Sequence, residues 1–153
     1  MTLQEKALEI AITQIGVEEA PGHKNTGKDV EKYLKEVGLG AGYSWCMAFN
    51  FWCFNEAADK MGRKNPLYKT GGVMEQWRQR KVEHRATTPQ PGDIFIMDYG
   101  KGMGHTGIVE KVNEDGTVST IEGNTNDDGS REGYEVCRRI RSRAKILGYL
   151  RFQ

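Results

Sequence analysis

The sequence lacks most of the features that would assign it to a specialised class of protein. It has three cysteines, an odd number that argues against a disulfide framework and fits a reducing compartment. No apolar run approaches the roughly 18 residues that a membrane span needs. Basic and acidic side chains nearly cancel, to a net charge of +1. Composition therefore gives no bias toward nucleic acid or membrane surfaces.

The sequence also shows no boundary between domains. It contains no internal repeat, low-complexity tract or linker. A chain of 153 residues is long enough to bury a core without disulfides or metal ions to stabilise it. Residues 1–153 are therefore predicted to form a single domain. Met1 is followed by Thr-Leu-Gln-Glu-Lys rather than by a basic and then an apolar run, so we expect synthesis in the cytoplasm without a signal peptide.

Helical patterns are present in the N-terminal part of the chain. Thr2 and Glu5 form a capping box, and Ser44 is a candidate N-cap for the most apolar helix. Glycines at the far ends of the patterns indicate where the helices stop. Four helices are expected, over residues 3–15, 30–37, 45–61 and 73–80.

Beyond Pro89 the pattern changes from helical to strand-like. Strands are expected over residues 94–97, 105–112, 117–124, 134–141 and 146–152, with residues 113–116 as a hairpin connection. Helices followed by antiparallel strands predict the α+β class, with the helices on one side of a curled sheet.

Cys46 falls in the first turn of the most apolar expected helix. The helix dipole and the unpaired N–H groups of that turn favour the thiolate, which is the reactive form of the side chain. The alternative is that Cys46 is one more apolar core residue. Its position at the helix start, together with partners further along the chain, favours a reactive thiol.

The hairpin supplies those partners. If the four-residue turn pairs Val112 with Thr117, then His105 lies opposite Asn124. Because side chains alternate between the two faces of a sheet, Glu122 projects from the same face as these two residues. A carboxylate and a carboxamide near an imidazole ring can hold it in one tautomer and orientation. A β-bulge would shift this parity.

Cys46 and His105 together provide the parts of a thiol hydrolase. A thiolate attacks a carbonyl group, an imidazole shares and returns the proton, and a polar third group orients the imidazole. The helix start can also supply a backbone N–H to the developing oxyanion. Tyr43 is a candidate second donor, the alternative being a packing residue.

Three segments in this order resemble the CHAP family, the cysteine, histidine-dependent amidohydrolases/peptidases related to NlpC-like cell-wall peptidases. The segments are Trp45-Cys46-Met47-Ala48-Phe49, Gly104-His105-Thr106-Gly107-Ile108-Val109 and Ile121-Glu122-Gly123-Asn124-Thr125-Asn126. The resemblance implies that Cys46 is the nucleophile, His105 the base, Glu122 the orienting carboxylate and Asn124 a supporting polar group. It also implies a papain-like α+β fold, with the cysteine helix packed on an antiparallel barrel-like sheet.

The same resemblance implies a substrate and a place of action. The substrate class is peptidoglycan, cut at the sugar–peptide amide or within the stem or bridge peptide. With no signal peptide expected, the protein would act as a phage or prophage lysin or as a secreted effector. Tyr43 and Trp45 are then candidate substrate-binding residues, and an immunity protein or a delivery system is a candidate partner. We expect no cofactor. Some members of the family bind calcium just before the cysteine, but residues 37–43 contain no carboxylate, so calcium is not expected there.

The sequence also allows other interpretations. One is an EF-hand-like spacing of polar residues, at Asn124, Asn126, Asp128, Gly129 and Glu135. Its flanks are strand-like and its first position is not Asp, which favours a polar loop at the cleft rim over a metal site. Another is a basic run, at Arg138, Arg139, Arg141, Arg143 and Lys145, expected to be a solvated face or to attract anionic wall polymer. The competing functions are a non-catalytic wall-binding or peptide-binding module and a cytosolic thiol amidohydrolase.

Overall fold

The computed structural model describes residues 1–80, 82–125 and 133–153. Within them the helices are α1 (Leu3–Thr13), α2 (Lys28–Glu36), α3 (Cys46–Met61) and α4 (Val73–Gln79), with short 3-10 turns at Val82–His84 and Arg143–Lys145. The strands are β1 (Arg85–Ala86), β2 (Ile94–Gly100), β3 (Met103–Val112), β4 (Val118–Thr125), β5 (Glu135–Arg141) and β6 (Gly148–Leu150). Most of the EF-hand-like segment, residues 126–132, lies outside the described residues.

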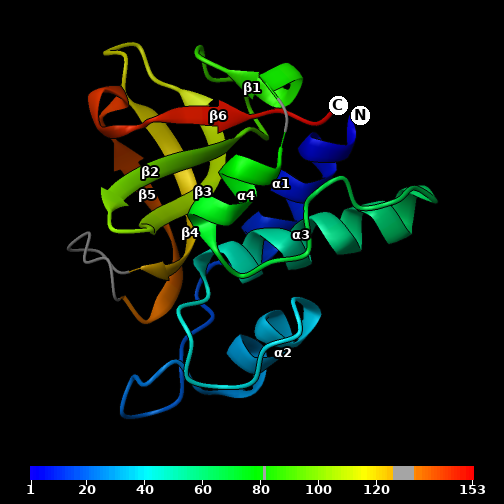
Figure 1. Cartoon of the computed structure of the whole chain (residues 1–153), viewed down its shortest axis with the longest axis vertical. Coiled ribbons are helices and arrows are strands. Elements are labelled where there is room, and N and C mark those ends of the chain that lie inside the picture. Colours follow the sequence, from blue (N-terminus) through cyan, green and yellow to red (C-terminus); the bar gives the residue numbers. More distant parts are fainter. Residues whose placement is uncertain (81, 126–132) are drawn as a thin grey trace.

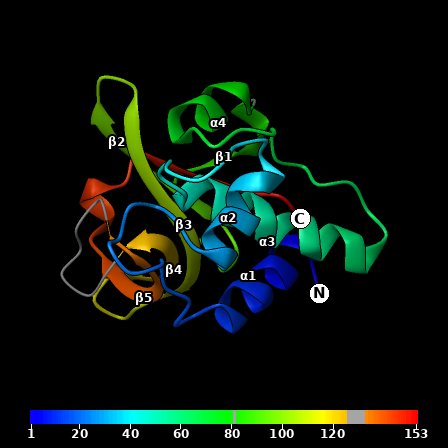
Figure 2. The same cartoon turned by 90° about the horizontal axis from the view of Figure 1, so that it is seen from below.

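The six strands form one antiparallel sheet in the order β1-β6-β2-β3-β4-β5. Helix α3 packs against β3 and β4, and α1 and α2 pack on α3. Figures 1 and 2 show that α2 lies on the side of α3 that is remote from the sheet. The predicted α+β class, with N-terminal helices on a C-terminal antiparallel sheet, is confirmed. Within the described residues, no helix combines the length and apolar character that a membrane span requires.

Helix α3 is the centre of the core. All of its residues from Cys46 to Phe54 are buried, as the absence of charge along this stretch predicts. Its start differs from the prediction by one residue. The N-cap is Trp45, not Ser44, and the Trp45 side chain makes no capping hydrogen bond.

The β3–β4 hairpin reaches the predicted arrangement by a different register. Val112 pairs with Val118, so the predicted Val112–Thr117 pair is wrong. A bulge at Glu110 then adds one residue to β3, after which Val109 pairs with Thr120. This second register is the one predicted for the far end of the hairpin, because the bulge offsets the one-residue error at the turn.

Apolar side chains cover both faces of the sheet. The larger cluster fills the space between the helices and one face, and includes nearly all of α3. A smaller cluster on β2, β3, β4 and β6 consists of Phe95, Met97, Val109, Val118 and Tyr149. The ring of His105 lies 6.1 Å from that of Phe95, centroid to centroid.

Candidate active site

Cys46 is the first residue of α3, at the point where this helix meets the sheet. It is a free thiol and is 5% exposed. Gly123 of β4 allows the close approach, because a Cβ atom there would lie 2.9 Å from atoms of both Phe49 and Trp45. The start of α3 therefore lies directly on β4, next to the strand residues that carry the predicted partners.

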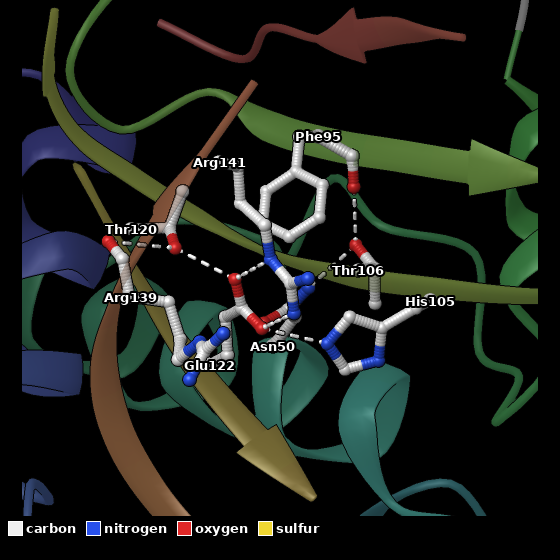
Figure 3. A network of polar contacts seen from close by, with 8 residues as sticks. All are labelled: Asn50, Phe95, His105, Thr106, Thr120, Glu122, Arg139 and Arg141. Atoms are coloured by element: carbon white, nitrogen blue, oxygen red, sulfur yellow. Dashed lines mark hydrogen bonds and ion pairs between the residues drawn. The ribbon is translucent and has the colours of Figure 1, made fainter. Parts of the chain in front are cut away.

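His105 on β3 and Glu122 on β4 form a buried pair (Figure 3). The distance from His105 Nε2 to Glu122 Oε1 is 2.7 Å, and the two side chains are 1% and 0% exposed. Gly107, which follows His105 on β3, leaves the space that the Glu122 side chain occupies. A Cβ atom at Gly107 would lie 2.6 Å from Cγ of Glu122. The predicted proximity of the imidazole and this carboxylate is thus present in the fold.

Glu122 also accepts hydrogen bonds from Arg141 and Thr120. Arg141 donates from Nη2 to Oε1 at 2.5 Å and from Nε to Oε2 at 2.8 Å, and the Thr120 hydroxyl donates to Oε2 at 2.6 Å. Burial alone would raise the pKa of Glu122, but the hydrogen bonds from Arg141 and His105 lower it to about 2. The carboxylate is therefore ionised at neutral pH.

His105 is correspondingly favoured in its charged form. Burial opposes the charge, but contacts with Cys46 and Glu122 more than offset it and raise the pKa of His105 to about 9. Nε2 is bonded to Glu122, and Nδ1 is buried without a hydrogen bond of regular geometry. Nδ1 is thus the nitrogen left to exchange a proton with the thiol, an alignment that commonly tightens only when substrate binds.

A second chain of hydrogen bonds fixes the helix to the strands, and sequence patterns gave no sign of it. The side chain of Asn50, one turn after Cys46, donates to the Thr106 hydroxyl at 3.1 Å. That hydroxyl donates to the backbone oxygen of Phe95 at 2.6 Å. Because Thr106 adjoins His105, this connection holds the start of α3 at a fixed distance from the imidazole (Figure 3).

Asn124 departs from the regular strand geometry on which its predicted place beside the imidazole rests. Its φ of 56° is left-handed, and the β4–β5 register shifts between Glu122 and Thr125. The alternation of side chains that placed Asn124 opposite His105 is therefore interrupted. Asn124 is 1% exposed, and its side-chain oxygen has no hydrogen-bond partner among the described residues.

The two candidate substrate-binding residues are placed very differently. Trp45 is fully buried, and its indole N–H donates to Glu19 at 2.7 Å. The prediction that Trp45 borders a substrate groove is corrected, because the indole is enclosed by the core and presents no surface to a ligand. Tyr43 is 56% exposed and lines a surface pocket that also includes Ser44.

Arg141 is the site residue that sequence reasoning missed. The sequence predicts it to belong to a solvated basic face, yet its side chain is only 12% exposed and is paired with Glu122. Its neighbour Arg138 fits the original expectation, because it is half-exposed and pairs with Glu110 at the surface. The alternation of residues along β5 could have separated the two arginines only if the β4–β5 register had been known.

The arrangement has the parts that acyl-transfer chemistry requires. They are a thiol at a helix start, an imidazole with one nitrogen anchored and one available, and an ionised carboxylate behind the ring. This is the kind of site found in cysteine hydrolases. Among the described residues, no group of three or more His, Cys, Asp or Glu side chains is placed to hold a metal ion.

Comparison with known families agrees with this class of site. The family model described as "CHAP domain" matches residues 38–124, a segment that contains Cys46, His105, Glu122 and Asn124. The chain therefore belongs to the CHAP family. No curated protein matches it.

Solved structures resemble the whole chain in fold. The crystal structure of a wild-type endolysin, LysIME-EF1, aligns with 99% of this chain and 64% of its own, with 17% identity and a TM-score of 0.60. The structure of Ly7917 aligns with 99% and 63%, with 16% identity and a TM-score of 0.58. This chain thus spans just under two thirds of the length of each. An N-acetylmuramoyl-L-alanine amidase from Staphylococcus aureus, 18% identical, aligns with 74% of this chain and 31% of its own at a TM-score of 0.43, too low a score to support a comparison.

Proposed function

We propose that this protein is a peptidoglycan hydrolase that cleaves an amide bond with Cys46 as its nucleophile. The observation that carries the proposal is the buried His105–Glu122 pair at 2.7 Å, placed beside a thiol that begins a helix. Membership of the CHAP family supports hydrolase chemistry. The fold shared with an endolysin supports a cell-wall substrate.

The proposed reaction has two steps. In the first, the Cys46 thiolate attacks the carbonyl carbon of the scissile amide, and His105 gives its proton to the departing amine as the C–N bond breaks. In the second, His105 takes a proton from water, which attacks the thioester and releases the carboxylate product and the thiol. Backbone N–H groups at the start of α3 would stabilise the oxyanion in both steps, and the Tyr43 hydroxyl is a candidate second donor.

Glu122 and Arg141 act behind the imidazole. Glu122 holds Nε2, which directs Nδ1 toward Cys46, and its negative charge stabilises the imidazolium that forms. Arg141 keeps that carboxylate ionised and fixed. Asn124 would then support the site by its position at the end of β4.

Two bonds are candidates for cleavage: the sugar–peptide amide, as in an N-acetylmuramoyl-L-alanine amidase, and a peptide bond within the stem or bridge. In either case the protein would act on the wall after release from the cell as a lysin, or after delivery as an effector. The released fragments distinguish the two reactions, because only the amidase separates glycan from intact stem peptide.

The test is mass spectrometry of the soluble products from purified peptidoglycan, with Cys46→Ala as the control. We expect fragments from the wild type alone, and their masses identify the bond. The variant should remain folded, since a smaller side chain at the helix start leaves the core of α3 in place. Fragments from Cys46→Ala would overturn the nucleophile assignment. No fragments from either protein, with several wall types, would favour a binding module or another amide substrate.

A further inference from the structure

A surface groove is formed by two pockets that share a lining residue, and its first part lies near the nucleophile in the chain. Its first part is a pocket of about 520 Å³ that begins at Ser44, two residues before Cys46. Tyr43 and residues 70–72 also line this pocket. Lys69 lines this pocket and also a second one, of about 710 Å³, on α2. The two pockets therefore adjoin at Lys69, between the residues just before α3 and those of α2.

The segment of residues 70–72 is held in place. The Thr70 hydroxyl donates to Glu75 of α4 at 2.5 Å, and the backbone N–H of Gly72 donates to the same hydroxyl at 3.0 Å. Gly71 lies directly against the base, where a Cβ atom would be 2.9 Å from Leu39. These contacts fix the conformation of residues 70–72, which line the groove.

The second pocket carries an excess of positive charge. It is lined by four lysines and two carboxylates: Lys28, Lys32, Lys35, Lys69, Asp29 and Glu36. Both carboxylates are engaged, Asp29 with Lys32 at 3.3 Å and Glu36 as acceptor from Asn55 at 3.1 Å.

The remaining three lysines are free to bind a ligand. Within the described residues, Lys28, Lys35 and Lys69 form no salt bridge. Lys32, by contrast, also lies over the ring of Trp52, with Nζ 4.5 Å from its centroid. Three ammonium groups that line one pocket attract anionic groups.

We propose that this groove binds the peptide part of the substrate, with its free carboxylates on Lys28, Lys35 and Lys69 and its scissile amide at Cys46. This proposal rests on the proposed function. Stem peptides are short chains that carry free carboxylates, whereas the amide to be cut is neutral. Phosphate groups of a secondary wall polymer share the same anionic chemistry, and the experiment below separates the two sources.

The test compares two triple variants with equal charge changes. The groove variant is Lys28→Gln/Lys35→Gln/Lys69→Gln. The control is Lys64→Gln/Lys111→Gln/Lys145→Gln, at exposed lysines that line neither pocket. We expect the groove variant to raise KM on peptidoglycan about tenfold at low ionic strength while kcat changes less than about twofold, since exposed charges act mainly on encounter and binding. The control should leave both constants unchanged, and added salt should reduce the difference.

Two modified substrates identify the anion. Peptidoglycan stripped of phosphate-containing polymers should retain the difference between the groove variant and the wild type. Peptidoglycan whose carboxylates have been amidated should abolish it. The opposite pattern would assign the lysines to the phosphate polymer and overturn the stem-peptide proposal.

A labelled triglutamate peptide separates failure of the groove from failure of the proposed function. We expect the wild type to bind it more tightly than the groove variant does, as measured by fluorescence anisotropy. Cleavage of peptidoglycan with equal KM values for the two triple variants would overturn the groove and leave the hydrolase proposal intact. Binding of triglutamate without any cleavage of peptidoglycan would support the groove and overturn the hydrolase proposal.

Discussion

Arg141 on β5 holds Glu122 on β4 with two hydrogen bonds, of 2.5 and 2.8 Å, and the shorter one is to Oε1, the oxygen that His105 also contacts. The carboxylate therefore contacts two cationic groups and is fully buried. A chain of contacts runs from Arg141 through Glu122 and His105 to Cys46. Arg141 is accordingly a positioning residue, and its removal should change how the imidazole titrates.

Arg141→Met should shift the acidic limb of the pH profile of kcat/KM to higher pH. Without the guanidinium, burial would raise the pKa of Glu122 with less opposition, by about one unit or more. A protonated Glu122 no longer stabilises the imidazolium, so activity should be lost at a higher pH than in the wild type. Arg141→Lys should show a smaller shift, because lysine keeps the positive charge but cannot form the bidentate hydrogen bonds to Glu122.

The matched control for Arg141 is Arg138→Met, on the same strand. Arg138 is 51% exposed and pairs with Glu110, so this variant should leave the pH profile unchanged. A purely structural role for Arg141 would lower activity equally at every pH. That result would contradict the proposed chain of contacts.

Glu122→Gln should reduce kcat less than His105→Ala does, because orienting a base matters less than having one. The loss for Glu122→Gln should still be about 10²–10⁴-fold, since the amide cannot stabilise an imidazolium as a carboxylate does. The new amide N–H₂ would also face the donors of Arg141, and we expect a loss of about 3 kcal/mol in the free energy of unfolding. Steady-state kinetics on peptidoglycan and urea unfolding measure the two effects. Equal kcat losses would mean that Glu122 does more than orient the ring.

Gly107→Ala should displace the carboxylate without changing any charged group. The new methyl would lie 2.6 Å from Cγ of Glu122 and 2.7 Å from the Phe95 ring. We expect kcat to fall at least about tenfold, because small misplacements of catalytic groups are costly. Gly40→Ala is the control, since nothing lies within 4 Å of its Cβ position. Similar kinetics for the two variants would show that the site tolerates movement of Glu122.

The His105–Glu122 pair should stabilise the fold most between about pH 4.5 and 6.5. Glu122 has its pKa lowered from 4.5 to about 2, so its contribution is present above pH 4.5 and is lost as the pH falls toward 2. His105 has its pKa raised from 6.5 to about 9, so its contribution is present below pH 6.5 and is lost as the pH rises through 9.

Thermal unfolding of the wild type and His105→Gln across this pH range measures that contribution. The difference in Tm between the two proteins should be largest between pH 4.5 and 6.5 and should shrink as the pH rises through 9. A difference that stays constant up to pH 10 would contradict the raised pKa of His105.

Local patterns in the sequence were sufficient to locate several elements. The capping box of Thr2 and Glu5 is present at the start of α1. The apolar run after Ser44 forms α3, and Gly62 ends that helix in the left-handed conformation. These features depend on residues within a few positions of one another, so the sequence specifies them without reference to the rest of the fold.

The proximity of His105 and Glu122 was also predictable, because a hairpin relates its two strands through a short turn. The exact pairing of the two strands was not predictable. The turn pairs Val112 with Val118, and a bulge at Glu110 restores the expected register further on. The left-handed backbone at Asn124 then ends the alternation from which its position had been deduced.

Contacts between distant segments were decided only by the tertiary structure. Trp45 is buried in the core, where Glu19, 26 residues earlier, accepts its indole N–H. Arg141 reaches Glu122 because β5 lies beside β4, and Lys69 meets the lysines of α2 because the segment before α4 packs on residue 39. The sequence by itself determined the helix that carries Cys46 and the hairpin that carries His105 and Glu122, since both follow from local periodicity. What surrounds them depends on long-range packing, for which a single sequence contains no periodic signal.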